Sequence, residues 1–140
     1  MTQRFGISDS VVSQIAATGE QPLVAGKLKS DTEYVILVVP LWFNVVTQFI
    51  VATEQQLLLA TKTLWHGVTE VLPIFYDDIY SVIVTVKKKK LMYVTQSDMN
   101  SKLVIRLKSG DMIELTTTNH ALVKAIGDTV AKYVDVSTQP

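Results

Sequence analysis

Cysteine is absent from the 140 residues of the chain. The fold therefore cannot depend on disulfide bonds, and zinc or redox chemistry that needs thiolates is excluded. The first twelve residues, MTQRFGISDSVV, contain no apolar run after their one arginine, so we expect no secretory signal there. Both features suit a cytoplasmic protein, and we expect that location.

Positive charge is not in excess. Lysine and arginine total 13, aspartate and glutamate total 13, and the formal net charge is zero. Proteins that bind nucleic acids usually carry a basic excess. Arg4 and Arg106 are the only arginines, so the forked donors that favour phosphates and guanines are scarce. We therefore expect no nucleic-acid partner.

Patterns that carry catalysis or hold metals are also scarce. His66 and His120 are the only histidines, and the chain has no phosphate loop, nucleophile elbow or zincin motif. Asp77 and Asp78 are adjacent carboxylates, but neighbouring residues of a strand point to opposite faces, so we do not expect them to share a ligand. We predict a non-enzymatic protein without catalytic residues, metal site or cofactor. A small hydrolase or metal enzyme is the alternative, and no motif supports it.

Apolar residues make up 48% of the chain, enough for one domain with a substantial core. One uncharged segment, Tyr34 to Ala52, approaches the ~20 residues that a membrane-spanning helix needs. Pro40, Asn44 and Gln48 interrupt it, and β-branched residues are dense. We interpret the segment as two consecutive buried strands, with a break near residues 40–44.

Most of the remaining chain predicts β-structure. Residues 53–56, TEQQ, separate two apolar runs and predict a hairpin connection. Asp77 and Asp78 interrupt the next apolar run and predict a bend. Residues 103–115 alternate in polarity on both sides of Ser109 and Gly110, which predicts a hairpin with a tight turn.

Helices are predicted near both ends of the chain. Ser8 is a suitable N-cap for a short helix that we expect to end near Gly19. Asn119 is a suitable N-cap for a final helix, in which Gly127 predicts close packing on the sheet. The apolar stripe of this final helix consists of Leu122, Val123, Ile126, Val130, Tyr133 and Val134.

The segments FIVATEQQLLLA, LPIFYDDIYSV and LVIRLKSGDMIEL, followed by the final helix, together resemble the bacterial pleckstrin-homology-like (PH-like) domains. The resemblance covers residues 20–134. It implies an α+β, mainly β fold: an antiparallel sheet or partial barrel of about seven strands, capped by a C-terminal helix and preceded by an extra N-terminal helix. We accordingly divide the chain into an N-terminal helical extension (1–19), a PH-like domain (20–136) and a tail (137–140). The family usually has Asn and then Arg before the leucine-rich strand, where this chain has Glu54 and Gln56, so no contact of that arginine carries over.

Aromatic and apolar residues near two predicted turns are candidates for a protein interface. Leu41, Trp42 and Phe43 fall in the expected connection between two strands, and Trp65 lies in the turn sequence TLWHG. They are either buried under the final helix or exposed at one end of the sheet as an insertion tip or subunit contact.

A run of four lysines is the candidate for an anionic ligand. Lys87, Lys88, Lys89 and Lys90 join two apolar runs, and each lysine near an anionic bilayer contributes about 1 kcal/mol. Eukaryotic relatives of the fold bind inositol phosphates with basic residues between the first two strands, and PLWFN supplies none here. We favour a charged turn that prevents edge pairing of strands, with weak membrane binding as the alternative.

The resemblance is to a family of bacteria and their phages, whose members can form rings. It implies a non-enzymatic scaffold that contacts other proteins or assembles with itself as a homo-oligomer. The alternative function is peripheral binding to anionic lipid through the lysine run.

Overall fold

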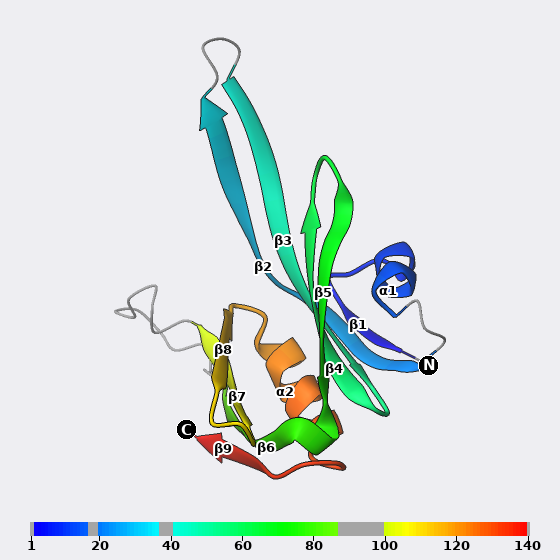
Figure 1. The fold of residues 1–140 in the computed structure, drawn as a ribbon, viewed down its shortest axis with the longest axis vertical. Coiled ribbons are helices and arrows are strands. Elements are labelled where there is room, and N and C mark those ends of the chain that lie inside the picture. The colour runs from blue at the N-terminus through cyan, green and yellow to red at the C-terminus, as the bar shows by residue number, and fades with distance from the viewer. Residues whose placement is uncertain (1, 17–19, 37–40, 87–99, 140) are drawn as a thin grey trace.

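The computed structural model describes residues 2–16, 20–36, 41–86 and 100–139, and the backbone alone at 31–36, 41–44 and 139. The described residues form nine strands, two α-helices and one 3₁₀ helix (Figure 1). In chain order these elements are β1 (Gln3–Phe5), α1 (Asp9–Ile15), β2 (Pro22–Ile36), β3 (Leu41–Thr53), β4 (Gln56–Thr63), β5 (Gly67–Phe75), η1 (Tyr76–Asp78), β6 (Ile79–Thr85), β7 (Ser101–Leu107), β8 (Met112–Thr117), α2 (His120–Val130) and β9 (Val136–Gln139).

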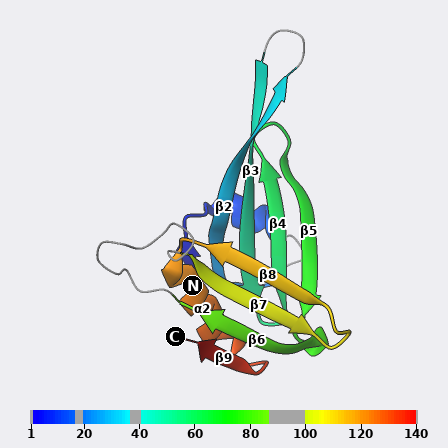
Figure 2. The ribbon, with the colours of Figure 1, turned by 90° about the vertical axis from the view of Figure 1, so that its left-hand side faces the viewer.

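The strands form two separate sheets. One has the order β1-β2-β3-β4-β5 and the other β8-β7-β6-β9, and the second sheet crosses the lower part of the first (Figure 2). One edge pair of each sheet is parallel, β1–β2 in the first and β6–β9 in the second, whereas the other pairs are antiparallel. The expected α+β, mainly β class is confirmed.

Two strands were not expected from the sequence. β1 and β9 raise the number above the expected seven or so, and β9 occupies positions where we expected a tail (137–140). Both are short and join a sheet edge as parallel strands. Neither QRF nor VSTQ alternates in polarity, so only their pairing with β2 and β6 reveals them.

The main core lies between the two sheets and α2. Asn119 caps α2 by accepting a hydrogen bond from the Leu122 N–H, as the sequence predicts. The helix ends at Val130, earlier than expected, so Tyr133 and Val134 lie in the turn that leads to β9. The fully buried residues with the largest side chains in this core include Ile50, Leu57, Leu103, Ile105, Leu122 and Ile126.

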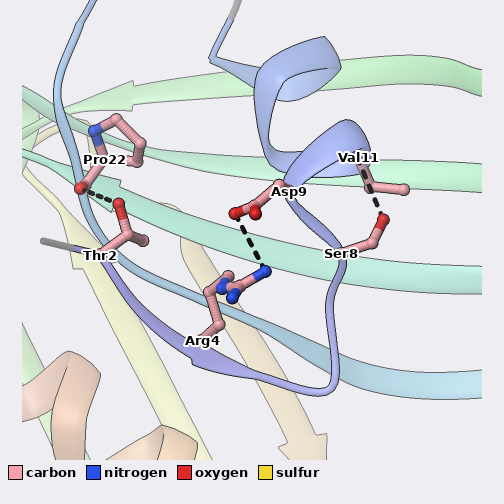
Figure 3. Close-up of polar contacts among 6 residues, drawn as sticks. All are labelled: Thr2, Arg4, Ser8, Asp9, Val11 and Pro22. Atoms are coloured by element: carbon pink, nitrogen blue, oxygen red, sulfur yellow. Dashed lines mark hydrogen bonds and ion pairs between the residues drawn. The ribbon is translucent and has the colours of Figure 1, made fainter.

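A second apolar cluster lies on the opposite side of the five-stranded sheet, which we call the outer face. Ser8 caps α1 and accepts a hydrogen bond from the Val11 N–H, and Arg4 pairs with Asp9 at 2.9 Å (Figure 3). The helix starts where predicted and ends at Ile15, while Gly19 lies outside the described residues. The cluster combines Val11, Val12 and Ile15 of α1 with Ala25, Phe49, Val51, Leu58 and Ala60 of the sheet.

β2 and β3 extend beyond the rest of the sheet as a two-stranded projection (Figure 1). We define the arm as residues 30–36 of β2 and 41–47 of β3. The expected pair of strands is present, but the break is placed earlier than expected, because Leu41 to Asn44 already belong to β3 and pair with residues 33–36. In the described ranges, none of the helices has the length and apolar character needed to cross a bilayer.

Three of the predicted turns and bends are present. Glu54 and Gln55 connect β3 to β4, and Gly110 adopts a positive φ of 99° between β7 and β8. Asp77 and Asp78 interrupt the chain between β5 and β6 as η1. Buried Gly127 confirms close packing of α2, because a Cβ built there would lie 2.9 Å from Cγ2 of Val84.

Candidate interaction surfaces

An open hollow of about 770 Å³ lies where the β3–β4 turn, η1 and the turn after α2 meet. We call it the η1 hollow. Its chain segments are brought together by the stacked rings of Tyr76 and Tyr133, whose centroids are 4.7 Å apart with planes inclined by 5°. The lining residues are Glu54, Gln55, Phe75, Tyr76, Asp77, Asp78, Lys132 and Tyr133.

A network of hydrogen bonds holds Tyr76, one of the residues that line the hollow, to the β3–β4 turn. The Tyr76 hydroxyl donates to the carbonyl of Thr53 at 2.6 Å. Thr53 Oγ1 donates to Glu20 and accepts from the backbone N–H of Gln56, whose side-chain amide also donates to Glu20 at 2.8 Å. Burial raises the pKa of Tyr76 well above its ordinary value of 10.0, with smaller contributions from Tyr133 and Glu20. Tyr76 is therefore a neutral structural donor near neutral pH.

The two adjacent aspartates lie differently from the sequence expectation. We placed Asp77 and Asp78 in a strand, where they would face opposite sides, but in η1 both line the hollow. Within the described ranges, no cluster of three or more His, Asp or Glu side chains could hold a metal ion. Lys132 adds a positive charge to the same surface, so its electrostatic character is mixed.

The two histidines lie far apart in the fold. His66 is exposed in the β4–β5 turn, whereas His120 Nδ1 lies 2.5 Å from the hydroxyl of Ser101. A serine beside a histidine is the beginning of a nucleophilic pair. Ser101 is fully buried, however, so the contact joins β7 to the start of α2 and presents no nucleophile to a substrate.

In the part of the chain that the structure describes, β5 is the last strand of its sheet and no strand pairs with its outer edge. This edge is a second candidate surface, and the direction of its backbone groups follows from one hydrogen bond. The Tyr76 N–H donates to the Gln55 carbonyl. The even-numbered residues at the end of β5 therefore also point their backbone N–H and C=O groups toward β4. The odd-numbered residues Val71, Pro73 and Phe75 alternate with them, so their backbone groups point away from the sheet. Pro73 therefore removes no hydrogen bond from the β4–β5 ladder, which explains why the strand tolerates it.

Apolar side chains accompany this edge. Val71 is 36% exposed, Leu72 is 49% exposed and Phe75 is 50% exposed. Val71 and Phe75 lie on the outer face, whereas Leu72 lies on the inner face opposite Leu59. A strand edge that no described strand pairs with, and that carries apolar side chains on both faces, is a typical site for association with another chain.

The residues proposed from the sequence are distributed over different parts of the fold. Trp65 is 55% exposed in the β4–β5 turn. Leu41, Trp42 and Phe43 begin β3, and their side chains lie outside the description. They therefore belong to the arm and not to a connecting loop. The candidate anionic-ligand residues Lys87, Lys88, Lys89 and Lys90 also lie outside the described residues.

The η1 hollow and the β5 edge were missed from the sequence. The hollow depends on Glu54, Asp77 and Tyr133, which are distant in the chain and carry no shared motif. The β5 edge could have been suspected, because the run VLPIF combines apolar residues with a proline that a central strand would not accept. No family model, curated protein or solved structure matches the chain.

Proposed function

We propose that the protein is a non-enzymatic interaction module of the PH-like class, which contacts another protein or a second copy of itself. The order of its elements supports the class. Four antiparallel strands, β2 to β5, are followed by three antiparallel strands, β6 to β8, and then by α2. This is the order that the resemblance implies, with α1, β1 and β9 as additions.

The β5 edge is the observation that carries the proposed function. It offers backbone N–H groups at Val71 and Phe75 and exposed apolar side chains on the same residues. A partner strand could pair with those groups while its side chains cover the apolar surface. Pro73 leaves a carbonyl but no N–H at the centre of the edge, which limits the length of any such pairing.

Light scattering coupled to size-exclusion chromatography tests self-assembly directly. Over a concentration series, we expect a mass above the 15.5 kDa of one chain. A Val71→Lys variant places a charge on the edge and a Glu114→Lys variant places one on exposed β8, where it serves as the matched control. A monomer at every concentration would exclude self-assembly and restrict the proposal to contacts with a different protein.

A further inference from the structure

The arm has two chemically different faces. The register pairs Thr32, Tyr34 and Ile36 of β2 with Val45, Phe43 and Leu41 of β3, in that order. Since alternate residues of a strand fall on opposite faces, these six residues share one face. Five of them are apolar or aromatic, and none is charged.

The other face of the arm carries the charges. Asp31 pairs with Val46, Glu33 with Asn44 and Val35 with Trp42. The carboxylates of Asp31 and Glu33 and the amide of Asn44 therefore share this face with three apolar residues. One charge-free face and one charged face are the pattern of a ribbon that buries a single side.

The charge-free face of the arm continues the outer face of the sheet. In β3, Leu41, Phe43 and Val45 have the same parity as Phe49 and Val51, because the register shifts between β2 and β3 leave β3 without an inserted residue. α1 covers Phe49 and Val51 lower on the sheet. Among the described side chains, Phe49 is the first residue of β3 that belongs to that cluster.

The backbone of the arm favours a protein over a lipid bilayer as the occupant of this face. Among the described residues, β1 pairs with β2 only as far as Gly26, and β4 pairs with β3 only from Val46 onward. The Val45 carbonyl also accepts a hydrogen bond from the Leu64 N–H. Within the described strands, residues 30–36 of β2 and 41–44 of β3 therefore each have one edge that no other strand pairs with. Unpaired backbone groups cost several kcal/mol each in hydrocarbon, whereas a protein neighbour can leave them in water or pair with them.

The area and charge of this face fit a second copy of the same arm. Tyr34 and Phe43 can bury about 300 to 500 Å² together, and Ile36, Leu41 and Val45 bring the total toward the ~800 Å² per partner of a standard interface. A two-fold axis would bring two uncharged faces together without repulsion. We propose that this protein forms a dimer through the charge-free faces of two arms, an inference that rests on the proposed function as an interaction module.

Adjacent residues provide a matched pair of variants. Phe43→Glu places a carboxylate on the charge-free face, whereas Trp42→Glu places the same group on the face that already carries Asp31 and Glu33. By light scattering, we expect wild type and Trp42→Glu to have about twice the mass of 15.5 kDa. Phe43→Glu should weaken the dimer at least about 30-fold, the loss typical of an aromatic residue central to an interface. Circular dichroism verifies that both variants are folded.

Single cysteines give a second test. Because the natural chain has no cysteine, a disulfide can form only between the introduced cysteines of two copies. We expect Tyr34→Cys or Phe43→Cys to form a disulfide-linked dimer under mild oxidation. Val35→Cys and Trp42→Cys, one position away on the opposite face, should stay uncrosslinked at the same protein concentration.

Each other outcome contradicts the arm dimer. If Phe43→Glu stays dimeric and Val71→Lys becomes monomeric, the β5 edge is the interface, and the proposed function stands without the arm dimer. If Phe43→Glu and Trp42→Glu weaken the dimer equally, the charge-free face is not the specific contact surface of the dimer. A monomeric wild type excludes the dimer, and pelleting of that monomer with neutral phosphatidylcholine vesicles would assign the arm to membranes.

Discussion

Gly26 of β2 and Leu122 of α2 approach so closely that no side chain fits between them. A Cβ built on Gly26 would lie 2.5 Å from Cδ1 and 2.6 Å from Cδ2 of Leu122, and both residues are buried. This contact joins α2 to the five-stranded sheet, so it fixes the helix over the main core.

Gly26→Ala should lower the free energy of unfolding by roughly 1 to 3 kcal/mol, because the added methyl group overpacks a core with no free space. Gly127→Ala is the comparison. Its Cβ would lie 2.9 Å from Val84, but alanine gains about 1 kcal/mol over glycine in a helix, which offsets part of the crowding. Urea unfolding measures both variants. A larger loss for Gly127→Ala than for Gly26→Ala would contradict this assignment.

Tyr76→Phe should lower the free energy of unfolding by about 1 to 2 kcal/mol. The substitution removes the buried hydrogen bond to the Thr53 carbonyl and keeps the ring that stacks on Tyr133. Tyr80→Phe is the matched control, because Tyr80 is 63% exposed, and it should change stability by less than about 0.5 kcal/mol. Equal effects of the two variants in urea unfolding would show that the buried hydroxyl contributes nothing.

The raised pKa of Tyr76 predicts a loss of stability at alkaline pH. In the unfolded chain the hydroxyl ionises near its ordinary value of 10.0, whereas in the folded protein it keeps its proton to higher pH. The folded state then binds more protons than the unfolded state, so stability is complete below about pH 10 and falls as the pH rises above it.

The pH effect is isolated by comparing wild type with Tyr76→Phe, since all other titrating groups are common to both. Their difference in unfolding free energy should be constant below the ordinary pKa and shrink by about 1 kcal/mol as the pH rises one unit above it. A difference that stays constant across that range would mean that the Tyr76 pKa is not raised.

The lysine run should bind anionic membranes weakly. Four lysines at about 1 kcal/mol each supply ~4 kcal/mol, which corresponds to a dissociation constant on the order of 1 mM. With vesicles containing phosphatidylserine at ~0.1 mM accessible lipid, we expect less than about a tenth of the protein to sediment. Greater, salt-sensitive sedimentation that disappears when Lys87 to Lys90 become glutamine would instead support the lipid function.

Local signals predicted many elements because their causes are local. The side chains of Ser8 and Asn119 cap helices by accepting a hydrogen bond from the N–H group three residues later in the chain. Gly110 has the positive φ that its hairpin turn requires. The polar residues Glu54 and Gln55 form the expected turn between two apolar strands, because exposure of a turn favours such residues.

Elements whose stability comes from distant neighbours were harder to predict. The sequence predicted a break near residues 40–44, but β3 already begins at Leu41. Asn44 is acceptable in this strand because it shares the charged face of the arm, and the arm could not be recognised from the sequence. Asp77 and Asp78 share a hollow only because η1 lies beside the β3–β4 turn and the turn that follows α2. β9 was expected to be a tail, since its pairing partner β6 lies more than fifty positions earlier.

The sequence by itself determined the mainly β class, the helix starts, the turns at residues 54–55 and 109–110 and the absence of disulfides, since each depends on residue type or on neighbours within a few positions. Only the tertiary structure decided which strand edges stay open, which faces α1 covers and which residues meet in the η1 hollow. These features depend on register and packing between distant segments, where one residue of shift moves every side chain of a strand to the other face.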